Sequence, residues 1–145
     1  MELNGETLRF IREHCKDDVR SLALQAPKYP GVDMPVALTQ IAGRQAAAEK
    51  IPSWHEEEGV LYPRHLSLEQ CSSEATARYK ASIIPESSSG TLTDLTGGFG
   101  IDCAFLSPKF HHVTYVERQE VLCEIASHNF PLLGLNHIRI ENKDG

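Results

Sequence analysis

The sequence has no apolar run near the roughly 20 residues that a membrane-spanning helix needs. Its first 15 residues, MELNGETLRFIREHC, carry five charged side chains and no apolar stretch, so we expect no signal peptide. It also has no block of Lys and Arg: residues 1–80 hold 10 basic and 12 acidic side chains, residues 81–145 hold 4 and 8, and the net charge is −6. A protein that grips a duplex with its own surface normally shows a basic stripe. Any contact with nucleic acid must therefore come mainly from elsewhere.

Cysteines are few and widely spaced. The four, Cys15, Cys71, Cys103 and Cys123, form no CxxC pair, and no Cys/His cluster has the spacing of metal ligands. A disulfide framework needs denser cysteines in a shorter secreted chain. We expect four reduced thiols in a cytoplasmic protein, with no metal site. His111 and His112 are expected to be solvated.

Capping residues and prolines divide the first 85 residues into helices. Asn4 and Asp17 are expected to cap the first two, and Asp33 a third over 34–50 that buries one face. The residues expected on that face are Leu38, Ile41, Ala42 and Ala46. Residues 51–65 are predicted to be an irregular connector in which Trp54 and Tyr62 pack. Ser72 or Ser73 is expected to cap the next helix; a rival start at Ser67 would make it longer.

The pattern changes after the polar segment ESSSG (86–90). TLTDL (91–95), VTYVE (113–117) and HIRIE (137–141) predict strands, and the segments between them predict helices, the second burying Val121, Leu122, Ile125 and Ala126. Strand–helix alternation implies a parallel sheet with right-handed crossovers. We therefore predict an α/β fold: an α-helical N-terminal domain (1–85), then the first βαβαβ half of a Rossmann-like sheet (86–145).

Three strands are only half of a doubly wound sheet. In the usual arrangement the first strand is central, so its second neighbour would be missing here. We expect a fragment of a longer protein, able to self-associate through an exposed strand edge. A complete small βαβαβ domain is the alternative.

A glycine-rich loop, DLTGGFG (94–100), follows the first predicted strand. Glycines at a strand-to-helix turn let a ligand approach the backbone. A dinucleotide prefers G-x-G-x-x-G, but Cys103 stands at the third glycine position, and Asp94 and Asp102 would repel a pyrophosphate. S-adenosylmethionine, with its ammonium and sulfonium centres, would instead be attracted. Glu117 lies 23 residues after Asp94, at a strand end where it can accept from both ribose hydroxyls.

The segment DLTGGFGID (94–102), followed by VTYVERQEVLCEIASHN (113–129), resembles the first two motifs of class I (Rossmann-like) S-adenosylmethionine-dependent methyltransferases. Asp94, Gly98 and Gly100 match the first motif, in which Thr96 replaces the usual first glycine. Glu117 matches the ribose-binding acid, and Asp144 the acid on the adenine side. The stretch EQCSSEATARYKA (69–81) resembles more loosely the helical part of bacterial methyltransferases that carry a THUMP-like RNA-binding module.

The resemblance implies a cofactor site of eight residues: Asp94, Thr96, Gly97, Gly98, Phe99, Gly100, Glu117 and Asp144. Four of them have other interpretations: Asp94 as a helix cap, Phe99 as a residue packed into the sheet, Glu117 as an exposed charge at a strand end, and Asp144 as a turn residue. Gln70, Ser72 and Ser73 are further candidates, since their helix leads into the first strand. No residue is assigned a catalytic role. Family members that methylate amino groups carry an (Asp/Asn)-Pro-Pro-aromatic motif after the fourth strand, and this sequence has none.

The expected function is S-adenosylmethionine-dependent methylation, with RNA as the acceptor implied by the resemblance alone. The chain would hold the cofactor-binding half and be inactive by itself. Two alternatives stay open. One is an NAD-dependent oxidoreductase, and the other is a non-enzymatic module whose helical domain binds a partner.

Overall fold

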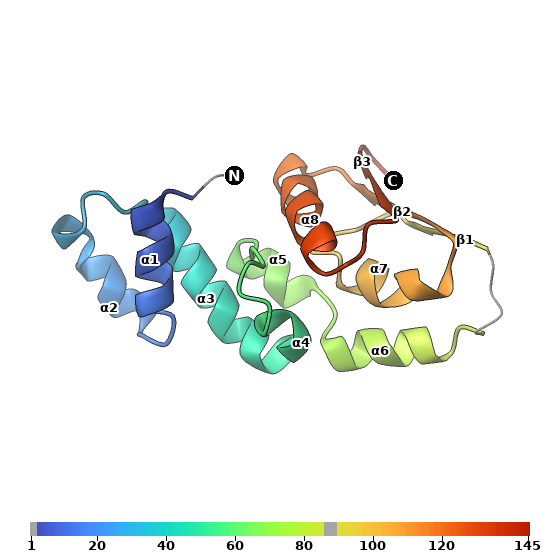
Figure 1. The fold of residues 1–145 in the computed structure, drawn as a ribbon, viewed down its shortest axis with the longest axis horizontal. Coiled ribbons are helices and arrows are strands. Elements are labelled where there is room, and N and C mark those ends of the chain that lie inside the picture. The colour runs from blue at the N-terminus through green and yellow to red at the C-terminus, as the bar shows by residue number, and fades with distance from the viewer. Residues whose placement is uncertain (1–2, 86–89) are drawn as a thin grey trace.

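The computed structural model describes residues 3–85 and 90–145, as seven helical segments followed by alternating strands and helices (Figure 1). The first group is α1 (Gly5–Glu13), α2 (Val19–Leu24), η1 (Ala26–Lys28), α3 (Met34–Lys50), α4 (Pro52–His55), α5 (His65–Gln70) and α6 (Glu74–Ser82). The second is β1 (Thr91–Asp94), α7 (Ile101–Leu106), η2 (Ser107–Lys109), β2 (His112–Glu117), α8 (Glu120–Leu132) and β3 (Ile138–Asn142). The predicted α/β fold class is confirmed.

The three strands form one parallel sheet in the order β1-β2-β3. Because side chains alternate along a strand, Leu92, Val113 and Ile138 share one face in register. They belong to the same apolar cluster as residues of α7 and α8, so both helices cover that face. The other face is mostly polar, with Thr91, Thr93, His112, Arg139 and Glu141 among its side chains. Among the described residues β1 is hydrogen-bonded on one side only.

Two apolar clusters hold the helices. The smaller lies between α1, α2 and α3, around Phe10, Leu22 and Ile41. The larger runs from Ala47, in the last turns of α3, to Phe130 in α8 and includes the sheet. Figure 1 accordingly shows α1 and α2 at the opposite end of the molecule from the sheet. The larger cluster contains residues from both sides of residue 85, while the division into domains at that point stays a prediction.

The connector between α4 and α5 is held between α3 and α8. The Gln40 amide, 2% exposed on α3, bonds both backbone groups of Tyr62, at 2.9 Å to the oxygen and 2.8 Å to the nitrogen. The buried Asn129 of α8 does the same for Leu61, at 2.9 Å in each case. Trp54 and Tyr62 are buried, as predicted. We call these two paired contacts, Gln40 with Tyr62 and Asn129 with Leu61, the amide clasps on the connector. The sequence does not reveal them, because the first pair is 22 residues apart and the second is 68 residues apart.

Some local predictions are wrong. Asp18, not Asp17, caps α2 by accepting from the Ser21 N–H, while Asp17 pairs with His14. Ser73 caps α6, as predicted, and the rival long helix from Ser67 does not form, because the backbone is extended at Cys71. Val121 is exposed.

The buried face of α3 also differs from the prediction. Of the four residues expected there, Ile41 is fully buried, while Leu38, Ala42 and Ala46 are half-buried. Ala37, Gln40 and Gly43 are buried instead. The reason is that one half of α3 packs against α1 and α2, while its other half packs against the connector. The contact with the connector is close, because a Cβ added to Gly43 would lie 2.3 Å from the Cβ of Tyr62.

Candidate functional site

The glycine loop between β1 and α7 is bent tightly against β2. Gly98 and Gly100 have φ values of 56° and 92°, in the left-handed region that favours glycine. A Cβ on Gly97 would lie 2.2 Å from the ring of Tyr115, and the Gly97 N–H donates to the Val116 carbonyl at 2.8 Å. The Tyr115 hydroxyl donates to the Gly98 carbonyl at 2.5 Å. All three glycines of the loop are therefore required: Gly97 because the Tyr115 ring lies so close, and Gly98 and Gly100 because of their left-handed backbone conformation.

The two strand-end acids both accept hydrogen bonds from the backbone. Glu117, 8% exposed at the end of β2, accepts from Gly98 N–H at 3.1 Å and from Gln119 N–H at 2.7 Å. Asp94, at the end of β1, accepts from Thr96 N–H at 3.2 Å. Asp94 does not cap α7, whose N-cap is Gly100. Burial raises the pKa of Asp94, and the carboxylates of Asp102 and Glu117 act in the same direction.

A cavity of about 360 Å³ opens at this end of the sheet. Around it the fold gathers the acids Asp94, Asp102 and Glu117 with the loop residues Thr96, Gly97, Gly98, Phe99 and Gly100. Seven of the eight predicted site residues therefore surround one cavity. The eighth, Asp144, does not line it and is exposed near the C-terminal residue.

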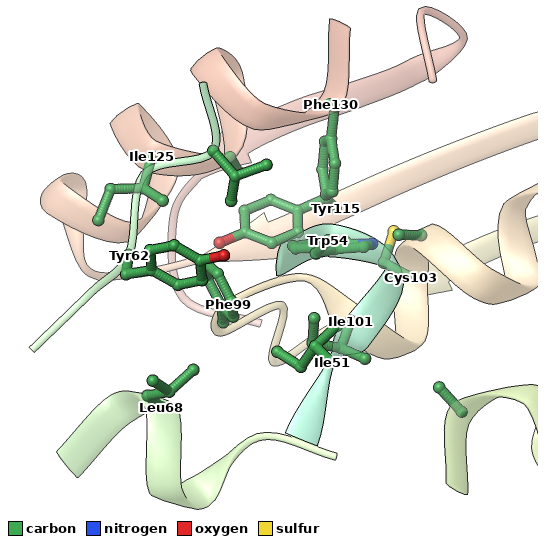
Figure 2. Packing of buried hydrophobic residues seen from close by; sticks show 14 of the residues in the cluster. Ile51, Trp54, Tyr62, Leu68, Phe99, Ile101, Cys103, Tyr115, Ile125 and Phe130 are labelled. Atoms are coloured by element: carbon green, nitrogen blue, oxygen red, sulfur yellow. The ribbon is translucent and has the colours of Figure 1, made fainter. Parts of the chain in front are cut away.

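Phe99 lines the cavity, but its ring belongs to the core. It is 2% exposed, and its centroid lies 5.2 Å from that of Trp54 and 5.8 Å from that of Tyr62. Figure 2 shows the three rings together among the buried side chains. Phe99 thus packs into the core, but its ring neighbours are Trp54 of α4 and Tyr62 of the connector. The ring anchors the glycine loop to the N-terminal part of the chain.

The junction between α5 and α6 forms another wall of the cavity. Ser67, Gln70, Cys71 and Ser72 line it, whereas Ser73 caps α6. Asp102, in the first turn of α7, accepts from Ser72 Oγ and from Lys80 Nζ, each at 3.0 Å. The sequence shows the charge of Asp102 but not these partners, since 30 and 22 residues separate them from it.

Neither a metal site nor a membrane span is found in the part of the chain that the structure describes. No group of three or more His, Cys, Asp or Glu side chains among residues 3–85 and 90–145 is arranged to hold a metal ion. Within the same ranges, no helix combines the length and the apolar character needed to cross a bilayer. Cys103 and Cys123 are buried thiols, and burial raises the pKa of Cys103 to about 12, so it is a poor nucleophile.

Comparison with known proteins gives structural matches only. No protein-family model matches the sequence, and no curated protein matches it significantly. One match is the crystal structure of a candidate methyltransferase from Porphyromonas gingivalis W83, whose sequence is 29% identical to this one. The two structures superpose with a TM-score of 0.72, and the match covers 93% of this chain and 33% of that chain. An rRNA methylase from Streptococcus thermophilus is 21% identical with a TM-score of 0.41, over 48% of this chain and 41% of that one.

This chain therefore spans about a third of the length of the Porphyromonas protein. The likeness to it includes the N-terminal helices as well as the three parallel strands, because nearly the whole of this chain is covered. The chain has part of a Rossmann-like methyltransferase fold, and it resembles part of a methyltransferase.

Proposed function

We propose that the protein is an S-adenosylmethionine-dependent methyltransferase and that this chain carries its cofactor-binding part. One observation carries the proposal: a bare glycine backbone and three carboxylates, Asp94, Asp102 and Glu117, line the same cavity. Carboxylates repel a pyrophosphate and attract a ligand with ammonium and sulfonium charges. The structural likeness to a methyltransferase supports the same reading.

The residues of this chain would bind and orient the cofactor rather than transfer protons. S-adenosylmethionine would supply an electrophilic methyl group to an acceptor nucleophile placed in line, and S-adenosylhomocysteine would be the leaving group. Glu117 would accept from the ribose hydroxyls, and the close glycine backbone would leave room for the ligand. Asp144 remains a proposed contact for the adenine amino group. Rate enhancement would come chiefly from holding donor and acceptor in position.

RNA is the acceptor class that we propose for the whole protein. Its support is the resemblance of residues 69–81 to RNA methyltransferases with a THUMP-like module. A net charge of −6 on this chain means that the RNA would be held mainly by other parts of the protein. Incubating the whole protein with methyl-labelled donor and a cell extract tests this: label in the RNA fraction is expected, and label only in protein or small molecules contradicts it.

Calorimetric titration with S-adenosylhomocysteine and with NADH tests the cofactor. We expect weak but measurable binding of S-adenosylhomocysteine, and its loss in Asp94→Asn. Glu49→Gln, an exposed acid on α3 outside the cavity lining, serves as the control that keeps binding. Tight binding of NADH with none of S-adenosylhomocysteine would overturn the proposal in favour of a dinucleotide enzyme.

A further inference from the structure

A groove of about 380 Å³ adjoins the cavity of the glycine loop. We call it the α3–α8 groove, because it runs between the first two turns of α3 and those of α8, with part of the connector and the start of α5 between them. Ser67, Gln119 and Leu122 line both the groove and the cavity, so the two share a wall. A molecule in the groove would therefore sit next to the ligand of the cavity.

The groove and the cavity differ in charge. Three carboxylates line the cavity and no Lys or Arg does, whereas Arg64 is the only charged side chain among the described residues that line the groove. Its guanidinium is exposed and has no hydrogen-bond or ion-pair partner in the described part of the chain. The acids next to the groove in the sequence, Asp33 and Glu120, do not line it. A phosphate would thus be repelled by the cavity and attracted to the groove.

The floor of the groove is apolar and held in place. Leu122 and Ile125 of α8 are buried there, while Val121, at the rim, is 48% exposed. On the other side, the amide clasp of Gln40 fixes the backbone of Tyr62. A flat ring such as a nucleobase could bury its faces against these side chains, and little ordering of the protein would be needed.

Polar groups with unused hydrogen-bonding capacity stand on the wall shared with the cavity. The Gln119 amide and the Ser67 hydroxyl have no side-chain hydrogen bond to any described residue. An amide both donates and accepts, as the edge of a base does, and the Arg64 guanidinium suits a phosphate. An apolar floor with a few convergent polar groups is typical of a site for a small, partly polar ligand.

We infer that the α3–α8 groove binds one nucleotide of the acceptor RNA, with the base on the apolar floor and the phosphate at Arg64. This inference rests on the proposed function and names residues of this chain that hold the acceptor. A nucleotide anchored there would bring its neighbour in the strand to the mouth of the cavity, beside the methyl donor. Transfer requires that donor and acceptor be held in this way. The base-and-phosphate chemistry favours nucleic acid over a peptide, whose backbone carries no charge.

Two variants of the whole protein test the groove, with RNA as the methyl acceptor. Arg64→Ala should raise the KM for RNA about two- to fivefold, as for a lost exposed ion pair, and leave kcat unchanged. It should also reduce the slope of log affinity against log salt by about 0.7, the value for one phosphate of a single strand. Val121→Asp should raise KM further, because it places a negative charge at the rim. An acid is compatible with the first turn of a helix, so α8 should persist.

The matched controls are Arg20→Ala and Leu24→Asp, which change exposed residues of α2 outside the groove. They should leave the KM for RNA and the salt slope as in wild type. Neither groove variant removes a residue that lines the cavity, so the affinity for S-adenosylhomocysteine should stay within about twofold for Arg64→Ala. Thermal unfolding identifies any variant that fails to fold.

Photo-cross-linking of the wild-type protein provides a test that needs no variant. Single-stranded RNA of random sequence that contains 4-thiouridine, irradiated with the protein and S-adenosylhomocysteine, should attach to residues 63–67 or 119–125. Adducts only at other sites, or an unchanged KM for RNA in both groove variants, would overturn the inference and leave the proposed function standing. Methyl label in protein or small molecules instead of RNA would refute the proposed acceptor, and the inference with it.

Discussion

The Glu117 carboxylate closes on the glycine loop by accepting the Gly98 N–H at 3.1 Å, across 19 residues of sequence. One side chain thereby links the end of β2 to the residue at which the loop turns left-handed. Since its other oxygen accepts from Gln119 N–H, the carboxylate also fixes the start of the segment leading into α8. The acid that we propose for ribose binding is thus also a structural part of the cavity.

Replacing Glu117 should therefore affect both binding and stability. Glu117→Ala leaves two backbone N–H groups without their acceptor, and we expect the free energy of unfolding to fall by about 1–2 kcal/mol. Binding of S-adenosylhomocysteine should fall at least tenfold. Urea unfolding and calorimetric titration measure the two effects. Glu124→Ala, an exposed acid in the middle of α8, should change neither; equal effects of the two variants would contradict the assignment.

The charge of Asp94 should make the protein less stable as the pH rises. The folded protein holds the Asp94 proton more tightly than the unfolded chain does, because burial raises the pKa of this carboxyl in the folded state. The resulting cost is absent below the ordinary pKa of 3.8 and fully present above the raised pKa. Asp94→Asn should leave the melting temperature unchanged near pH 3.5 and raise it by up to about 4 °C at pH 7.

Such a variant would be more stable and yet bind the cofactor more weakly. Melting curves between pH 3.5 and 7.5, recorded with and without S-adenosylhomocysteine, test both statements. A variant that loses stability progressively as the pH rises, relative to wild type, would contradict the burial argument.

Gly97 should not tolerate a side chain, although its φ is not in the left-handed region. The Cβ of Gly97→Ala would lie 2.2 Å from the ring of Tyr115, which is buried and hydrogen-bonded to Gly98. Overpacking of this kind costs about 1–3 kcal/mol, and we expect that loss in chemical unfolding. Gly90→Ala is the matched control, because nothing lies within 4 Å of its added Cβ. If both variants unfold like wild type, the loop is not packed as described.

The amide clasps on the connector should matter more than surface amides. Gln40→Ala leaves two backbone groups of Tyr62 without partners in the core, so we expect a loss of about 2–4 kcal/mol. Asn129→Ala should behave similarly through Leu61. Gln45→Ala on the same helix also removes two hydrogen bonds, to Cys15 and Asp17, but at the exposed surface. It should cost less than about 1 kcal/mol, and a loss as large as that of Gln40→Ala would contradict this account.

The sequence by itself determined the features that depend on local chemistry. Asn4, Asp33 and Ser73 cap their helices, and period-two strands alternate with helices around a glycine loop. A parallel sheet brings the ends of β1 and β2 to one edge, so the grouping of Asp94 with Glu117 also followed from strand order. These features were predictable because the residues responsible lie within a few positions of one another, or because the topology leaves one choice.

Only the tertiary structure decided which distant groups meet. It turned the Phe99 ring into the core against Trp54, and it tied Asp102 to Ser72 and Lys80 from an earlier helix. It also rotated the buried face of α3 toward two different neighbours. Such choices depend on how whole elements pack, and many arrangements satisfy the same local pattern. The energy that selects among them comes from contacts between residues that the sequence keeps far apart.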